Sequence, residues 1–200
     1  PAKSLIVESF VKFSREVSII AVRGQNGDVK TWALAENHHH NGILSHSIVP
    51  APNSADLQPV AQDYITRLLN HLNYVGVLTL ELFVTEQGLY ANEMAPRVHN
   101  SGHWSIEGAV CSQFENHIRA VAGLPLGSTD VVRPTVMINI IGQHPKTEDV
   151  LALDGAHLHL YNKTERQGRK LGHITLMPVD AAQLTTLCRQ LAKILPEPLA

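Results

Sequence analysis

The chain has 200 residues, a hydrophobic content of 44% and a formal net charge of −2. This apolar content is enough for the core of one large domain or two small ones. The near-neutral charge provides no basic field, so we expect no nucleic-acid partner. No apolar run approaches the ~20 residues that cross a bilayer and no signal-peptide pattern opens the chain, so we expect no membrane partner and a cytoplasmic location.

The first third of the sequence alternates between short apolar runs and polar segments. Asn26-Gly27 has the composition of a turn between two strands, and the four histidines within 38–46 indicate a polar loop. Asn53-Ser54 precedes apolar positions at helical spacing, which predicts the start of a helix. In chain order we expect strands at 5–7, 16–22 and 29–34, a polar loop at 36–47, and a helix from 53 to about 72.

The rest of the sequence contains further strands and helices. Gly127 to Arg133 looks like a boundary between two domains. Gly123 and Pro125 predict the end of the helix that precedes it. In chain order we expect a hairpin at 77–93, a helix at 112–122, a strand at 135–141, a short helix near 147–152, a strand at 157–161, a basic loop, a strand around 173–176 and a helix at 181–195.

The hairpin contains two glutamates whose relative position follows from its register. Residues 77–84 alternate, which places Glu81 on the face opposite the leucines. The connection Glu86-Gln87-Gly88 is typical of a three-residue loop with glycine in the left-handed position. That loop pairs Thr85 with Leu89, and therefore Glu81 with Glu93. The two carboxylates then stand opposite each other on one face.

Two interpretations of this carboxylate pair stay open from the hairpin alone. Like charges directly opposite each other destabilise a sheet, which favours a cation between them. Mg²⁺ binds carboxylate oxygens together with substrate phosphates, so it fits such a pair. The other interpretation is a solvated hairpin edge with two ordinary surface acids, because edge strands often carry charge.

The segment after the second strand is dense in polar residues. It reads Asn92-Glu93-Met94-Ala95-Pro96-Arg97-Val98-His99-Asn100-Ser101-Gly102-His103-Trp104. Together with Glu81, it resembles the metal-binding hairpin of ATP-grasp ligases, and in particular of those that carboxylate aminoimidazole ribonucleotide. Further motifs resemble this family in the same order along the chain: 8–11 with Glu16, 21–24, 39–44 and 166–173.

The resemblance implies an α+β fold with two parts. Residues 1–130 would contain the large ATP-grasp subdomain, mostly antiparallel sheet with helices, and residues 131–200 a small C-terminal α/β domain. The implied activity is carboxylation of aminoimidazole ribonucleotide by ATP and bicarbonate, through carboxyphosphate, with Mg²⁺ as the metal and a homodimer as the assembly. The family has a long N-terminal portion that this chain lacks, and no GxxxxGK[ST] motif is present. We therefore expect a partial enzyme that does not hydrolyse ATP at an enzyme-like rate by itself.

The resemblance also implies roles for individual residues, all of which are expectations. Glu81 and Glu93 would hold Mg²⁺, while Arg97 and His99 would contact bicarbonate or carboxyphosphate. The residues expected to bind the 5′-phosphate of the ribonucleotide are Lys163, Arg169 and Lys170. The residues expected to bind ATP are Glu8, Ser9, Phe10, Val11, Glu16, His39, Asn92 and Glu93.

Each assignment has an alternative that the residues leave open. The histidines 38–40 with His46 could ligate zinc, or belong to an ordinary polar loop. Arg97 could form a structural ion pair with Glu107 or Glu115. The late basic run could be a solvated hairpin tip. For the whole chain, the alternatives are another ATP-grasp ligase, of the formate-using purine ligase or biotin carboxylase type, or a folded, dimerising fragment without turnover.

Overall fold

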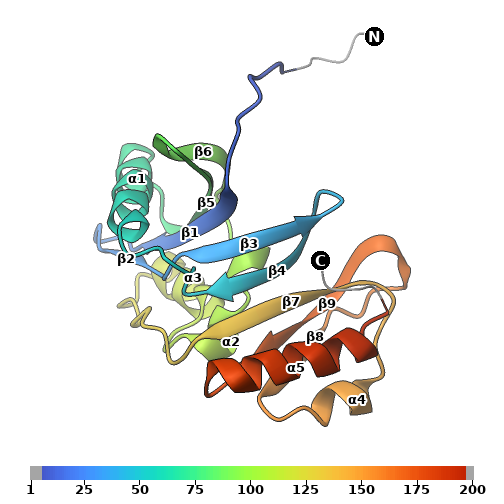
Figure 1. The fold of residues 1–200 in the computed structure, drawn as a ribbon. Helices are drawn as coiled ribbons and strands as arrows, with labels where there is room; N and C mark the ends of the chain where they lie inside the picture. Colours follow the sequence, from blue (N-terminus) through green and yellow to red (C-terminus); the bar gives the residue numbers. More distant parts are fainter. Residues whose placement is uncertain (1–5, 197–200) are drawn as a thin grey trace, which may run out of the picture.

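The computed structural model describes residues 6–196, and in this part of the chain nine strands form one antiparallel sheet (Figure 1). The strand order is β6-β5-β1-β3-β4-β7-β9-β8, with β2 paired to β1. The α+β class is therefore confirmed. The strands are β1 (Arg15–Arg23), β2 (Val29–Thr31), β3 (Ala35–His40), β4 (Ile43–Val49), β5 (Gly76–Thr85), β6 (Gly88–Ala95), β7 (Thr135–Gly142), β8 (Ala156–Leu160) and β9 (Arg166–Leu176).

The helices lie on both faces of this sheet. Leu69 of α1 packs with Leu80 of β5 on one face, whereas Ala120 of α3 packs with Val22 of β1 on the other. Successive residues of a strand point to opposite faces, so β1 and β5 contribute to both cores. The helices are α1 (Leu57–His71), α2 (Ser105–Gly108), α3 (Gln113–Val121), α4 (Thr147–Leu151) and α5 (Ala181–Ile194), with a short 3₁₀ helix η1 (Asn100–Gly102).

A third apolar core lies in the C-terminal part. Strands β7 and β9 supply Ile138 and Ile174, and α4 and α5 supply Val150 and Leu191. This core contains buried residues only from position 136 onward. The sheet itself runs across the proposed boundary, because β4 pairs with β7. The division into two domains at 130/131 stays a prediction. The C-terminal part has its own core, but it shares one sheet with the rest of the chain.

The segment 36–47 is a β-hairpin and not the polar loop that we expected. Strands β3 and β4 pair antiparallel around Asn41-Gly42, which have φ angles of 49° and 74°. Positive φ at both central residues is the geometry of a type I′ turn, which suits the twist of the flanking strands. The histidines hid an alternation of buried and half-buried positions along β3.

Other boundaries differ from the sequence prediction. Ile6 and Val7 are almost fully exposed and belong to no strand, while Leu5 lies outside the described residues. The segment leads away from the sheet, so its apolar side chains find no neighbouring strand (Figure 1). Helix α1 begins later than expected because Asn53 has a φ of 49°, outside the helical range. Strand β2 is shorter than the predicted 29–34, and β9 extends back into the predicted basic loop.

The β5–β6 hairpin confirms the predicted pairing of Glu81 with Glu93, but its turn and register differ from those predicted. Thr85 pairs with Gly88, so the turn has two residues rather than three. A bulge then inserts Asn92, because Leu82 pairs with Ala91 while Glu81 pairs with Glu93. The shorter turn and the extra residue compensate each other. Glu81 and Glu93 therefore stand directly opposite.

We predict that Leu69→Ala lowers the free energy of unfolding by about 2–5 kcal/mol, because Leu69 is fully buried against β1 and β5 and its truncation leaves a cavity. Leu72→Ala is the matched control, since Leu72 follows the same helix and is 46% exposed. Urea unfolding of both variants measures the difference. Equal losses would contradict the packing of α1 on the sheet.

Candidate functional site

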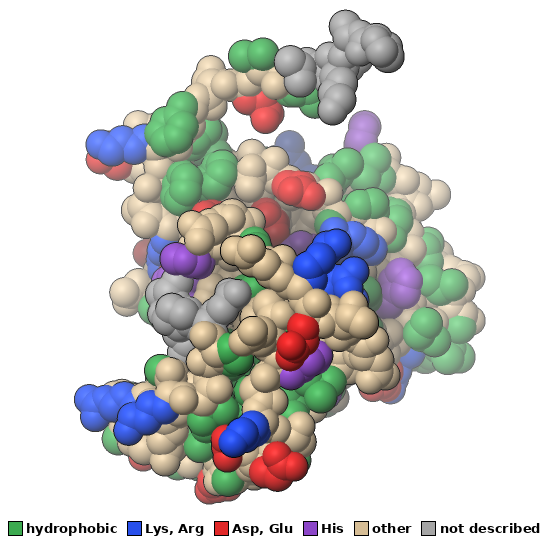
Figure 2. All heavy atoms as spheres, turned by 90° about the vertical axis from the view of Figure 1, so that its right-hand side faces the viewer, with side chains coloured by type: hydrophobic (Ala, Val, Ile, Leu, Met, Phe, Trp, Pro, Cys, Tyr) green, Lys and Arg blue, Asp and Glu red, His purple; other side chains and the backbone are tan. Residues whose placement is uncertain are grey.

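A cleft of about 700 Å³ lies where β1, β3, β5 and β6 meet the first half of β9. Acidic, basic and histidine side chains gather around a hollow in the middle of one face of the molecule (Figure 2). The cleft brings together seven of the fourteen site residues predicted from the sequence. The residues that line it are Glu16, His39, Gly42, Ile43, Leu44, Glu81, Asn92, Glu93, His99, Gly168 and Lys170.

Three carboxylates, of Glu16, Glu81 and Glu93, share this cleft, and the other two affect the pKa of Glu81. Burial raises the pKa of Glu81 above its ordinary value, and the nearby Glu93 and Glu16 raise it further. Lys170 and Arg97 act in the opposite direction. A cation between the carboxylates would relieve this repulsion. The oxygen donors of the two opposed glutamates, with the Asn92 amide beside them, fit a hard ion such as Mg²⁺.

His99 links the Glu81 carboxylate to two buried serines, Ser101 and Ser18. Its Nε2 lies 3.2 Å from Glu81 Oε1, and its Nδ1 lies 2.8 Å from Ser101 Oγ. Ser101 Oγ in turn accepts a hydrogen bond of 2.8 Å from Ser18 of β1. Burial lowers the pKa of His99 to about 4, with Arg97 and Lys170 adding to the effect. The ring is therefore neutral at pH 7 and donates through Nε2.

Lys170 reaches the same cleft from β9. Its Nζ donates to Asn100 Oδ1 at 2.9 Å. The Asn100 amide is paired with the Asn139 amide of β7 in both directions, at 2.9 and 2.7 Å. Burial lowers the pKa of Lys170, and Glu81 opposes this shift. The two asparagines thus hold a half-buried cation near the carboxylates.

Glu16 and His39, both expected to bind ATP, lie close together in the structure. Their side chains lie 3.3 Å apart across the β1–β3 pair, at the edge of the cleft. The other residues expected at the nucleotide, 8–11, lie in the irregular segment before β1 and do not line the cleft. Their assignment stays a prediction.

The predicted phosphate-binding residues divide into two groups. Lys170 lines the cleft, whereas Arg169 donates to the Thr164 carbonyl at 3.2 Å and Lys163 lies 5.4 Å from the Tyr161 ring centroid. Arg97 is exposed and donates to the Val98 carbonyl. Burial lowers the pKa of Lys170, and the positive charges of Arg97 and Lys163 also lower it.

The zinc alternative for the histidines and the ion-pair alternative for Arg97 are not supported. His38 and His46 stack with ring centroids 4.3 Å apart, while His39 points toward Glu16. Among residues 6–196, no group of three or more His, Cys, Asp or Glu side chains is arranged to hold a metal ion by itself. Glu107 pairs with His159, and Glu115 with Arg119, so neither is the partner of Arg97.

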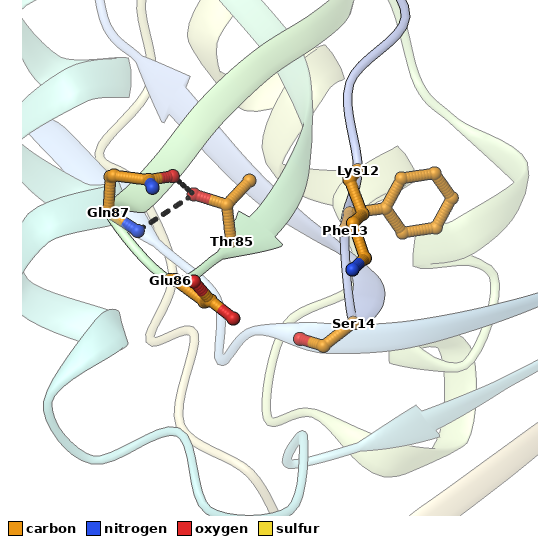
Figure 3. Close-up of a pocket in the computed structure, with 6 residues that line it drawn as sticks. All are labelled: Lys12, Phe13, Ser14, Thr85, Glu86 and Gln87. Carbon is orange, nitrogen blue, oxygen red and sulfur yellow. Dashed lines mark hydrogen bonds between the residues drawn. The ribbon is translucent and has the colours of Figure 1, made fainter.

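A second hollow of about 450 Å³ lies near the tip of the β5–β6 hairpin (Figure 3). It lies between Lys12–Ser14 and Thr85–Gln87. Thr85 Oγ1 accepts a hydrogen bond from the Gln87 backbone within the turn. Phe13 stacks on Phe83, with ring centroids 4.4 Å apart. The lining contains one lysine and one glutamate, and it lacks the opposed glutamates and the histidines of the cleft.

The sequence analysis missed several polar residues that support the cleft. Asn139 and Ser18 sit in buried strands, and a polar residue in an apolar strand is the signal that had already identified Glu81. Gln113 carried no such signal, since it follows an ordinary helix cap at Ser112.

A cluster of rings lies behind the cleft. His173 stacks on His159 with centroids 4.4 Å apart, and its Nδ1 lies 2.7 Å from the Tyr161 hydroxyl. His103 lies 5.1 Å from His173. Burial lowers the pKa of His173 to about 3, with His103 and His159 adding to the effect. The His173 ring is therefore uncharged near neutral pH.

None of the helices in the described part of the chain combines the length and apolar character needed to span a membrane.

Comparison with known proteins agrees with this geometry. Residues 1–114 match the ATP-grasp domain family, and residues 135–186 match the phosphoribosylaminoimidazole carboxylase C-terminal domain. The fold and the carboxylate pair thus define an ATP-grasp protein.

Curated relatives and solved structures show which ATP-grasp proteins this chain is similar to. N5-carboxyaminoimidazole ribonucleotide synthase of Vibrio vulnificus (strain YJ016) is 50% identical over 98% of this chain and 52% of its own length. The crystal structure of the synthetase from Thermus thermophilus has a TM-score of 0.92 and 52% identity, covering 95% of this chain and 53% of that one. The Aspergillus clavatus synthase, in complex with ADP and 5-aminoimidazole ribonucleotide, has a TM-score of 0.85 and 32% identity, covering 92% and 52%.

The chain belongs to the ATP-grasp family, and it is similar to N5-carboxyaminoimidazole ribonucleotide synthases over almost all of its own length. It spans about half the length of the curated relatives that it matches.

We predict that stability falls as the pH drops from about 6.5 toward 3, in part through His173. The unfolded chain takes up a proton at this histidine near pH 6.5, whereas the folded chain resists it until about pH 3. His173→Gln should reduce the slope of unfolding free energy against pH by up to about 1.4 kcal/mol per pH unit. Urea unfolding between pH 7 and 4 measures it. His157→Gln, at an exposed histidine of β8, is the control, and an unchanged slope in both variants would contradict the prediction.

Proposed function

We propose that this chain is part of an ATP-grasp ligase that uses ATP and bicarbonate to carboxylate 5-aminoimidazole ribonucleotide. The observation that carries the proposal is the cleft in which Glu81, Glu93, His99 and Lys170 come together from three strands and a loop. The names of the relatives support the substrates, and the Aspergillus clavatus structure contains ADP and the aminoimidazole nucleotide.

In this proposal Glu81 and Glu93 hold Mg²⁺, with Asn92 beside them. Bound Mg²⁺ would align the phosphates and neutralise charge that develops during phosphoryl transfer. The raised pKa of Glu81 supports the assignment, because burial and then the negative charges of Glu93 and Glu16 raise it, and a bound cation would oppose these effects. His99 keeps Glu81 oriented from behind, through the contact of 3.2 Å.

The nucleotide would occupy the end of the cleft near Glu16 and His39. Their pairing leaves a carboxylate and an imidazole at the edge of the β1–β3 ladder, where hydroxyl and amino groups of a nucleoside find partners. Residues 8–11 belong to this proposal by family resemblance alone.

The opposite end of the cleft carries the cations. Arg97 presents a planar guanidinium suited to a small oxyanion such as bicarbonate or carboxyphosphate. Lys170 lies between this end and the carboxylates, so it can contact the same anion. Lys163 and Arg169 would bind the 5′-phosphate of the ribonucleotide, with Lys170 completing the set.

A homodimer, a cytoplasmic location and the two-domain division at 130/131 are part of the same proposal. They rest on the family resemblance, since a ligase of soluble metabolites needs no membrane. The activity concerns the complete protein that contains this chain.

The test of the function is substrate dependence in the polypeptide expressed from its complete gene. ADP formation should require both bicarbonate and 5-aminoimidazole ribonucleotide. Dependence on formate or on biotin instead would identify another ATP-grasp ligase. A folded protein without turnover under any of these conditions would support the non-catalytic alternative.

We predict that Glu93→Gln lowers kcat/KM for Mg²⁺-dependent ATP cleavage by at least about 100-fold, since an amide is a poor ligand for Mg²⁺ and leaves phosphate charge unbalanced. Circular dichroism should show an intact fold. Glu86→Gln is the control, because Glu86 lies in the turn of the same hairpin and outside the cleft. Near wild-type turnover of the Glu93 variant would refute the metal assignment.

We predict that Arg169→Ala raises the KM for the imidazole nucleotide about tenfold and the KM for ATP much less. A phosphate contact is made in both ground and transition states, so its loss appears mainly in KM. Arg166→Ala serves as the matched control from the exposed start of the same strand. Equal changes for both substrates would mean that Arg169 only stabilises the loop through Thr164.

A further inference from the structure

One buried amide holds the middle of the loop that carries Arg97, His99 and Asn100. Gln113, the first residue of α3, has no exposed surface. Its Oε1 accepts from the His99 backbone N–H at 2.9 Å, and its Nε2 donates to the His99 carbonyl at 2.7 Å. A single side chain therefore satisfies both backbone groups of His99.

The same amide also determines where His103 carries its proton. Gln113 Nε2 lies 3.1 Å from His103 Nδ1, and an amide nitrogen can only donate. Burial lowers the pKa of His103 to about 4, so the ring is neutral at pH 7. A neutral ring whose Nδ1 accepts has its proton on Nε2.

Gln113 is itself oriented by contacts that do not involve His99. Its backbone N–H donates to Ser105 Oγ at 3.0 Å, and Ser105 Oγ donates to the Gly102 carbonyl at 2.6 Å. A Cβ atom at Gly102 would lie 2.7 Å from Gln113 Oε1 and would clash with Ile20 Cδ1. The loop of residues 97–102 therefore packs closely on the Gln113 amide, which restricts the conformation of the loop.

We propose that Gln113 is a positioning residue of the cleft: it fixes the His99 backbone so that the ring reaches Glu81, and it holds His103 with its proton on Nε2. Gln113 is not among the residues that line the cleft, so it acts through the two histidines. The inference rests on the proposed function for the role of His99, but its test measures protonation rather than turnover.

A merely structural role at the start of α3 would be served by any side chain of the same shape. Gln113→Glu keeps the shape and the acceptor for the His99 N–H, but removes both donated hydrogen bonds. The readout is the protonation of each imidazole nitrogen, from nitrogen NMR of the isotope-labelled chain at pH 7.

In the wild type, the His103 Nδ1 should be unprotonated. In Gln113→Glu we expect this nitrogen to carry a proton, because the introduced carboxylate accepts and cannot donate. The His99 Nε2 proton should also exchange with water about tenfold faster, corresponding to the loss of one net hydrogen bond.

Gln58→Glu is the matched control. Gln58 accepts from the Leu34 N–H at 2.8 Å and donates to the Trp32 carbonyl at 3.2 Å, so α1 makes the same kind of backbone contact with the segment between β2 and β3. It should cost comparable stability and leave His103 unchanged.

An unprotonated His103 Nδ1 in folded Gln113→Glu would overturn the proposal, as would the same change in Gln58→Glu. If the carboxylate prevents folding, Gln113→Met removes the donor without adding charge, and His103 should then show a mixture of both tautomers. A single, wild-type tautomer in that variant would equally overturn it. Failure of the ligase assay would leave these results intact, so the two hypotheses fail separately.

Discussion

The register of β5 against β6 is the constraint on which the cleft depends. The side-chain period of a strand is two, so a slip by one residue would turn Glu93 to the other face of the sheet. The two-residue turn and the bulge at Asn92 together prevent this and leave Glu81 opposite Glu93. Two like charges then face each other at a place where burial already disfavours ionisation of Glu81. The cations and donors nearby, Lys170 and His99, are arranged around that pair.

Holding those groups requires many buried polar side chains, each of which has to be paired to avoid a desolvation cost. The structure meets this requirement with short relays. Ser18 donates to Ser101, which contacts His99, and Asn139 pairs with Asn100, which contacts Lys170. Each relay begins on a central strand and ends at a side chain of the cleft. The positions of His99 and Lys170 therefore depend on contacts with central strands, although His99 itself lies on the loop before η1.

Long periodic segments were predictable from the sequence. The strands around Glu81 and the helices α3 and α5 follow from apolar spacing, and the opposed glutamates follow from alternation. The β3–β4 hairpin was missed because its histidines obscure the pattern, although Asn41-Gly42 was a usable turn signal. Asn139 bonds the Leu44 carbonyl 95 positions away, so no local pattern could reveal that contact. Roles such as that of residues 8–11 came from family resemblance, and the fold does not test them.

The pairing of β4 with β7 limits how the molecule can admit ligands. The cleft has walls on both sides of this ladder, with Glu81 on one part and Lys170 on the other. Separating the two parts as rigid bodies would break four paired positions, from His46 with Ile138 to Val49 with Thr135. The Asn41-Gly42 turn, whose glycine lines the cleft, has no ladder to break, so we expect ligands to enter and leave beside it. Movement of this turn breaks no pair of the β5–β6 ladder, so Glu81 and Glu93 stay opposite each other whatever conformation the turn adopts.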